Sequence, residues 1–263
     1  MEFKEVVGSR RSVRFFRPWR PVEREKIQVI FEAANRSSRS VNADYPRAVV
    51  VNRVDLDAET IDLLRNPTTT ADLDLAPTYI FWYFDGNYME GARDRLKELV
   101  QFGALTPSHG WSEAYVDDVV YAQVLKPLAD TPELVMFMGA VETGIAICNA
   151  INAAVDEGLS TCMHAFAGPA VERAKELFKI PDSWVPVWLQ LVGYSAEEKE
   201  AGGQRPRRPI SVSYFEGSTD RPFEEDPAVT ERLQRERLLQ TPGPFPWRAT
   251  EVRMLSRMFG LPE

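Results

Sequence analysis

The chain has 263 residues, 44% of them hydrophobic, so it can bury the sizeable core of a globular protein. Its formal net charge of −8 argues against general binding to nucleic acids or to anionic membranes, because both need a net positive surface. The opening residues, MEFKEVVGSRR, contain no apolar signal segment. Together with only two cysteines, this favours a cytoplasmic protein.

Hydrophobic periodicity and turn residues predict alternating helices and strands up to residue 194. The expected helices lie within 21–38, 54–66, 88–100, 113–125, 132–157 and 169–180. Runs of apolar, aromatic or β-branched residues predict strands at 47–52, 77–86, 159–166 and 184–194. No repeats or low-complexity tracts interrupt this order.

The segment 132–157 is apolar most of the way round a helix, yet it contains Glu142, Asn149, Asn152 and Asp156. A membrane span rarely contains that set of polar side chains. We therefore expect a central, buried core helix and no membrane partner.

After residue 195 the sequence changes to charged loops, prolines and two amphipathic segments that cannot form a core alone. We expect residues 1–212 to form the main domain. Residues 213–263 are expected to be an extension that packs on this domain or on a partner subunit.

Two groups of arginines stand out in this acidic chain. The first lies in GSRRSVRFFRPWR near the start, and the second is Arg205, Arg207 and Arg208 in QRPRRP. Arginine presents a planar fork that matches phosphate oxygens, so the two groups could converge on one phosphate. Two solvated surface patches are the alternative, since exposed arginines are common.

The residue types that bind metals are scarce. The chain has only His109, His164, Cys148 and Cys162, and their spacing matches no zinc motif. We therefore expect no metal site, and we interpret Cys162 as a packing residue.

Several segments in register resemble the FMN-dependent nitroreductase family. They are RRSVRFF, VEREKIQVIFEAA, SSRSVNADYPRAVVV, APTYIFWYFD, GIAICNAINAAVDEGLSTCMHAF, ELFKIPDSWVPVWLQLVGY and RPRRP, which together cover roughly residues 3–212. The resemblance implies an α+β, nitroreductase-like fold, with a central mixed or antiparallel sheet flanked by helices. It also implies an intertwined homodimer with FMN at the subunit interface, which the C-terminal extension would wrap.

The resemblance also assigns site residues. It implies that the FMN phosphate and ribityl chain are bound by Arg10, Arg11, Ser12, Arg14, Arg205 and Arg207. Ser40 and Asn42 match a loop that touches the flavin ring, and Ala165, preceded by His164, matches the turn whose backbone N–H meets flavin N5. His164 could act as an acid there, although a half-buried structural histidine is the alternative.

The chain departs from the family pattern in this loop. Asp44, Tyr45 and Pro46 replace the usual Gln-Pro-Trp, and Arg39 stands where a serine is common. A lysine that faces the flavin's pyrimidine edge in relatives is also absent. Arg39 could supply that positive charge, or it could be a solvated loop residue.

Three functions remain open. The first is an FMN-dependent oxidoreductase that uses NADH or NADPH to reduce nitroaromatic, quinone or similar electron-poor compounds by ping-pong hydride transfer. The second is a specialised ene reductase, dehalogenase or dehydrogenase of a biosynthetic intermediate. The third is a flavin-binding protein without turnover, because fold alone does not establish activity.

Overall fold

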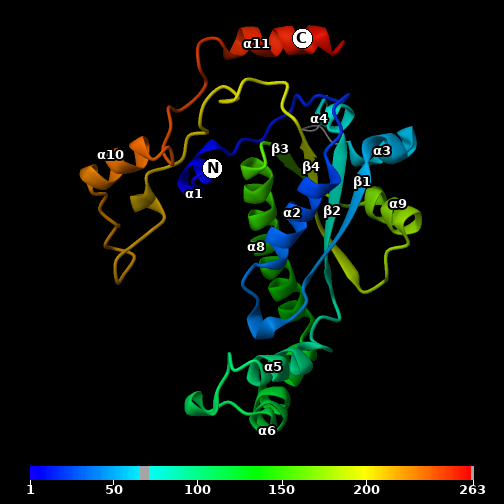
Figure 1. The fold of residues 1–263 in the computed structure, drawn as a ribbon, viewed down its shortest axis with the longest axis vertical. Coiled ribbons are helices and arrows are strands. Elements are labelled where there is room, and N and C mark those ends of the chain that lie inside the picture. Colours follow the sequence, from blue (N-terminus) through cyan, green and yellow to red (C-terminus); the bar gives the residue numbers. More distant parts are fainter. Residues whose placement is uncertain (66–70, 262–263) are drawn as a thin grey trace.

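The computed structural model describes residues 1–65 and 71–261. Its described strands form one antiparallel sheet in the order β1-β2-β4-β3 (Figure 1). The strands are β1 Pro46–Asn52, β2 Thr78–Asp85, β3 Ser160–His164 and β4 Trp184–Gly193. This confirms the α+β fold and the predicted strands, and the sheet is antiparallel rather than mixed.

Strand β2 is central because both of its faces are apolar. Phe81 and Tyr83 point into one core cluster, while Ile80 and Trp82 point into another on the opposite face. This alternation follows from the two-residue period of a strand. Pro186 of β4 has no N–H for the ladder, and it lies where the β2–β4 register shifts beside Tyr83.

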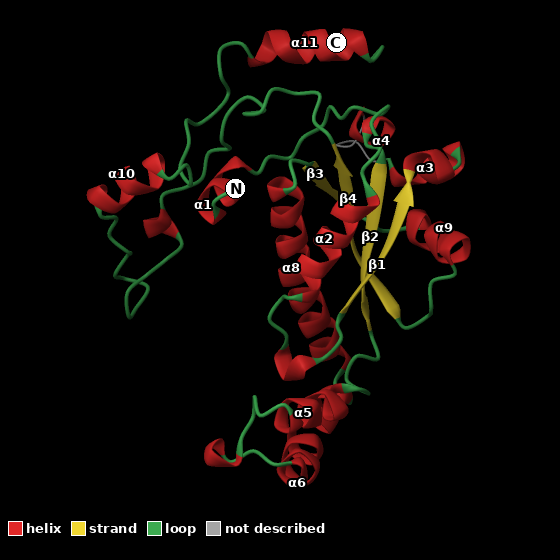
Figure 2. Cartoon of the chain, in the orientation of Figure 1, coloured by secondary structure: helices red, strands yellow, loops and turns green. Residues whose placement is uncertain are grey.

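Helices cover both faces of the sheet. The α-helices of the described chain are α1 Phe3–Ser9, α2 Arg24–Asn35, α3 Ala58–Leu64, α4 Ala71–Leu75, α5 Ala92–Gln101, α6 Glu113–Tyr115, α7 Lys126–Ala129, α8 Pro132–Asp156, α9 Pro169–Phe178, α10 Pro227–Arg235 and α11 Arg248–Met258. Helices α2 and α8 pack together on one face, and α3 and α9 pack together on the other (Figures 1 and 2). Between α6 and α7 the chain continues as a π-helix, Val116–Leu125. The short helices α1 and α4 were not predicted.

Helix α8 is central, as expected of a core helix, but in the single chain only one side of it is buried. Its buried side includes Ala146 and Ile147, and a Cβ on Gly139 would lie 2.5 Å from the ring of Phe84. The opposite side exposes Phe137 and Val141. By length and composition alone α8 could cross a membrane, a property shared by core helices of water-soluble proteins.

The segment after α1 runs across the end of the sheet. Ser12 pairs with Thr161 of β3, and the Val13 N–H donates to the Thr161 carbonyl over 3.1 Å. Phe16 pairs with Ser195, directly after β4. These backbone contacts place the first arginine group beside the ends of β3 and β4.

The C-terminal extension lies outside the sheet and its helices (Figures 1 and 2). Helix α11 contributes the buried Leu255, and the Phe259 ring that follows it stacks on Phe15 at 6.3 Å between centroids. Helix α10 has no buried residue, and several large apolar side chains before it, including Tyr214 and Phe215, are exposed. The division at residue 212 stays a prediction.

Candidate active site

The structure brings the two arginine groups together. Arg10 is half-buried and feels the positive charges of Arg207 and Arg205. Burial lowers the pKa of Arg10, and the neighbouring arginines lower it further. None of the three forms an ion pair with a carboxylate of the described residues. Clustered, partly desolvated cations without a neutralising acid favour an anion as their partner.

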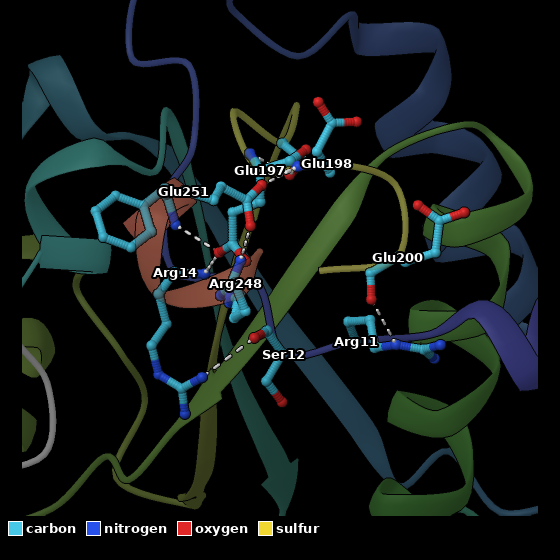
Figure 3. A network of polar contacts seen from close by, with 10 residues as sticks. Arg11, Ser12, Arg14, Glu197, Glu198, Glu200, Arg248 and Glu251 are labelled. Atoms are coloured by element: carbon cyan, nitrogen blue, oxygen red, sulfur yellow. Dashed lines mark hydrogen bonds and ion pairs between the residues drawn. The ribbon is translucent and has the colours of Figure 1, made fainter. Parts of the chain in front are cut away.

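Arg11, although adjacent to Arg10, has a different environment. It is only 5% exposed, and its guanidinium donates to the carbonyls of Gly8, Arg10 and Glu200 and to Oε1 of Gln240, over 2.7–3.2 Å. Figure 3 shows the contact with Glu200. Most of its donors are therefore used within the N-terminal segment and on the loop after β4, and one holds the segment against the extension.

Ser12 and Arg14 lie where the N-terminal segment runs alongside β3 (Figure 3). Ser12 is half-buried and the Arg14 side chain is exposed. The backbone N–H groups of Arg14 and Phe15 donate to Oε1 of Glu197 over 2.7 and 3.0 Å. Glu197 therefore fixes the direction of the backbone at this point.

The anchor Glu197 is completed by the C-terminal extension. Its side chain is 0% exposed and accepts from Nη2 of Arg248 on α11 at 2.6 Å. Arg248 also pairs with Glu251, which accepts in turn from the Glu198 N–H (Figure 3). The first arginine segment is thus held by a residue far along the chain.

At the end of β3, the His164 side chain and the following residue, Ala165, lie in different environments. His164 is 6% exposed, and its Nε2 lies 2.8 Å from Oδ2 of Asp72 on α4. Ala165, directly after the strand, is exposed. The backbone of this turn is therefore accessible to a ligand, whereas the imidazole is directed into the core, against the interpretation of His164 as an open acid.

Asp72, His164 and Cys162 form a buried cluster. Their ligand atoms all lie within 4.8 Å of one another. Burial opposes ionisation of Asp72 most strongly, but His164 and Cys162 outweigh it and the pKa of Asp72 is lowered. Burial, with the charge of Asp72, raises the pKa of Cys162 to about 12. Without a ligand, this cluster therefore contains a carboxylate and a thiol.

The predicted flavin-ring loop is placed elsewhere on the chain. Ser40 donates from both N and Oγ to Oε1 of Glu142 on α8, at 3.2 and 2.5 Å, and Asn42 adopts a left-handed φ of 55°. Arg39 pairs with Asp44 at 3.1 Å and donates to the Asn35 side chain at 2.9 Å. Within the described part of the chain, no hydrogen bond or ion pair joins this loop to the arginine groups. Within one chain, the two parts of the predicted site remain separate.

Comparison with known proteins identifies the family. The model of the Nitroreductase family matches residues 7–194, well over half of the chain. This protein belongs to the nitroreductase family. No curated protein matches in sequence.

Solved structures of other nitroreductases share the fold at low sequence identity. A putative NAD(P)H:FMN oxidoreductase from Staphylococcus epidermidis is 19% identical with a TM-score of 0.63, covering 81% of this chain and 94% of its own. A putative nitroreductase from Exiguobacterium sibiricum, in complex with FMN, is 18% identical with a TM-score of 0.62, covering 82% and 98%. The enone reductase CLA-ER of gut-bacterial fatty acid metabolism is 19% identical with a TM-score of 0.59, covering 80% and 94%.

Sequence reasoning missed two features of this nitroreductase site. Asp72 was not selected, because it alternates with Leu73, Asp74 and Leu75 before β2 and nothing in that pattern distinguishes a buried acid from an exposed one. The anchor between Glu197 and Arg248 was also missed, because each residue lies in a segment rich in charges that look solvated.

Proposed function

We propose that this protein is an FMN-dependent oxidoreductase that takes hydride from NADH or NADPH and passes it to an electron-poor acceptor such as a nitroaromatic or a quinone. The observation that carries the proposal is the approach of the two arginine groups, where Nε2 of Gln204, next to Arg205, donates to the Gly8 carbonyl at 3.2 Å and Arg10 lies within the field of Arg205 and Arg207. The family match and the FMN-bound relative support FMN as the cofactor.

The arginine cluster fits a terminal phosphate. A phosphate monoester carries about −1.5 to −2 charges and offers three acceptor oxygens. Charge-assisted hydrogen bonds contribute about 1.5–3 kcal/mol each, so three arginines can retain FMN in a protein of net negative charge. Arg10 and Ser12 would approach from the N-terminal segment, and Arg205 and Arg207 from the loop after β4. Arg11 would support Arg10 rather than bind phosphate, because its donors are already used.

The flavin, when bound, supplies the hydride chemistry. The task of this chain is to hold the ring and leave one face open. The exposed backbone at Ala165 is available to donate a hydrogen bond to the ring, as the family resemblance implies. The His164 imidazole, directed toward Asp72, would not deliver a proton to the substrate.

A second copy of the chain would complete the site. Helix α8 exposes Leu134, Met136, Phe137, Val141 and Ile145, each at least 41% exposed in the single chain. Such a stripe on a core helix needs a cover, and an identical stripe provides one in a twofold dimer. Ser40, bound to α8 through Glu142, and the neighbouring Asn42 would then lie close to this interface and reach the partner's flavin.

The test is an anaerobic titration of the purified protein with NADH and then NADPH, following the visible flavin band. We expect stoichiometric FMN and bleaching by at least one nicotinamide. Arg10→Gln should weaken FMN binding by about 10- to 100-fold, the loss of one charge-assisted bond. Arg36→Gln, a substitution of an exposed arginine directly after α2, is the matched control. Absence of a flavin band after addition of FMN would refute the proposal.

Acceptor assays separate the reductase from its alternatives. Steady oxidation of nicotinamide with quinones or nitroaromatics supports the broad reductase. Activity confined to enones would favour the specialised ene reductase. We include this test because one of the similar solved structures is an enone reductase. A flavin that no nicotinamide reduces would point to a dehydrogenase or to a binding protein without turnover.

A further inference from the structure

The buried cluster of Asp72, Cys162 and His164 is not used by the function proposed above. Cys162 and His164 lie two residues apart on β3, so both side chains project from the same face of the strand. Asp72 reaches them from α4, a different element. Asp72 is 2% exposed, Cys162 4% and His164 6%. Three different metal-binding side chains therefore meet in the core.

The cluster is not satisfied by hydrogen bonds of its own. Nε2 of His164 and Oδ2 of Asp72 are 2.8 Å apart and attract each other electrostatically, but neither atom forms a hydrogen bond of good geometry. The other carboxylate oxygen accepts from the Leu73 N–H at 3.2 Å. A buried polar atom without a partner costs about 1–3 kcal/mol. An ion bound between the two atoms would satisfy both of them after a small separation.

The donor set selects the kind of ion. A thiolate disfavours Mg²⁺ and Ca²⁺, which prefer oxygen ligands, whereas sulfur, imidazole nitrogen and carboxylate oxygen together suit Zn²⁺. One carboxylate and one thiolate also neutralise a divalent cation, so the occupied site would carry no net charge in the core.

We propose that Asp72, Cys162 and His164 form a Zn²⁺ site that joins α4 to β3, with water as the fourth ligand. Binding forms a Zn–S bond and breaks the S–H bond of Cys162, whose proton passes to the solvent. The metal would also bind Nε2 of His164 and Oδ2 of Asp72, the two atoms that lack partners.

The geometry needs only small side-chain movements. Zinc lies about 2.0–2.2 Å from nitrogen or oxygen and about 2.3 Å from sulfur, which in a tetrahedron separates the ligand atoms by roughly 3.3–3.6 Å. The histidine and aspartate atoms, 2.8 Å apart, must separate by about 0.5 Å. Cys162, within 4.8 Å of both, must approach by at most about 1.5 Å, which rotation about its Cα–Cβ bond can supply.

The first experiment measures the metal in the intact flavoprotein. Protein is stripped with a chelator, dialysed, and titrated with Zn²⁺ in competition with a chromophoric chelator. We expect uptake of one Zn²⁺ per chain and a higher Tm with zinc, because an ion that binds only the folded state stabilises it. Co²⁺ should give a thiolate-to-cobalt charge-transfer band in the difference spectrum against metal-free holoprotein.

The chain offers matched controls, since it has only two cysteines and two histidines. Cys162→Ser and Asp72→Asn should each weaken Zn²⁺ binding by more than about 100-fold, the upper range for loss of an outer-shell contact. Cys148→Ser, at the exposed cysteine, and His109→Gln, at the exposed histidine, should leave it unchanged. Absence of stoichiometric uptake by the wild type, or uptake abolished by Cys148→Ser but retained by Cys162→Ser, would overturn the proposal. Retention of FMN in either case would show that the flavin function stands independently.

Discussion

Replacing Arg248 with methionine should destabilise the protein by removing the cation of a buried ion pair. Arg248 is 15% exposed and contacts Glu197, whose side chain is 0% exposed, at 2.6 Å. Burial lowers the pKa of Arg248, but Glu197 and Glu251 outweigh it, so the net pKa is raised and the guanidinium is charged. Methionine keeps much of the side-chain volume while removing the charge.

The expected loss in the free energy of unfolding depends on the hydrogen bonds that Glu197 keeps. Removal of one partner of a buried ion pair costs about 3–5 kcal/mol, because the other charge is left uncompensated. Glu197 would still accept from the N–H groups of Arg14 and Phe15, which offsets part of this cost. We therefore expect a loss of about 2–4 kcal/mol, or a decrease in Tm of about 5–15 °C for a chain of this size.

The assay is urea unfolding followed by far-UV circular dichroism, at fixed protein and FMN concentrations. Arg253→Met, on the exposed side of the same helix, is the control. The double variant Glu197→Gln/Arg248→Met should lose less free energy of unfolding than the two single variants together, because it leaves no unpaired charge. An Arg248→Met variant within about 0.5 kcal/mol of the control would refute the reasoning.

Three further predictions test other parts of the structure. Phe137→Glu, in the exposed stripe of α8, should convert a dimer to monomer in sedimentation experiments, because it places a charge in an apolar interface. Deletion of residues 218–263 removes Arg248 and Leu255 and should lower Tm and weaken FMN binding, both measurable by thermal scans and flavin fluorescence. Asp57 caps α3, and Thr60, with Arg173, lowers its pKa to about 2. Its contribution is therefore present above its unfolded pKa of about 3.9 and lost as pH falls toward 2, so the difference in Tm between wild type and Asp57→Asn should shrink across that interval.

The strands were predictable because the sheet is buried on both faces. In β2 the aromatic and β-branched run from Tyr79 to Phe84 leaves no exposed position, so local composition alone distinguishes it from a loop. The long helix α8 was also predictable, but not its exposure. A helix face covered by a second chain has the same apolar pattern as a face buried in the core of its own chain. The sequence therefore could not distinguish the two for Phe137, which is exposed in the single chain.

The buried cluster was not predictable because it depends on tertiary contact alone. Cys162 and His164 are separated by one position on β3. Asp72 comes from a short helix before β2, which the hydrophobic periodicity of the sequence did not predict. Pairing β3 with β4, and β4 with β2, carries α4 to the end of β3. A search for metal ligands by sequence spacing compares only neighbours along the chain, so it could not find a cluster that tertiary contacts assemble.

The different environments of Arg10 and Arg11 show how the extension defines the proposed site. By sequence both residues are equally suited to phosphate, and only tertiary partners distinguish them. Gln240, from the extension, takes one donor of Arg11, and a Cβ on Gly8 would lie 2.0 Å from the Arg237 carbonyl, so the extension packs directly on this turn. Both arginines lie near Arg205, but Arg11 uses its guanidinium donors within the described part of the chain, and the next turn is fixed through Glu197. We therefore expect the extension to support the proposed phosphate site, so that substitutions in it change FMN affinity without touching FMN.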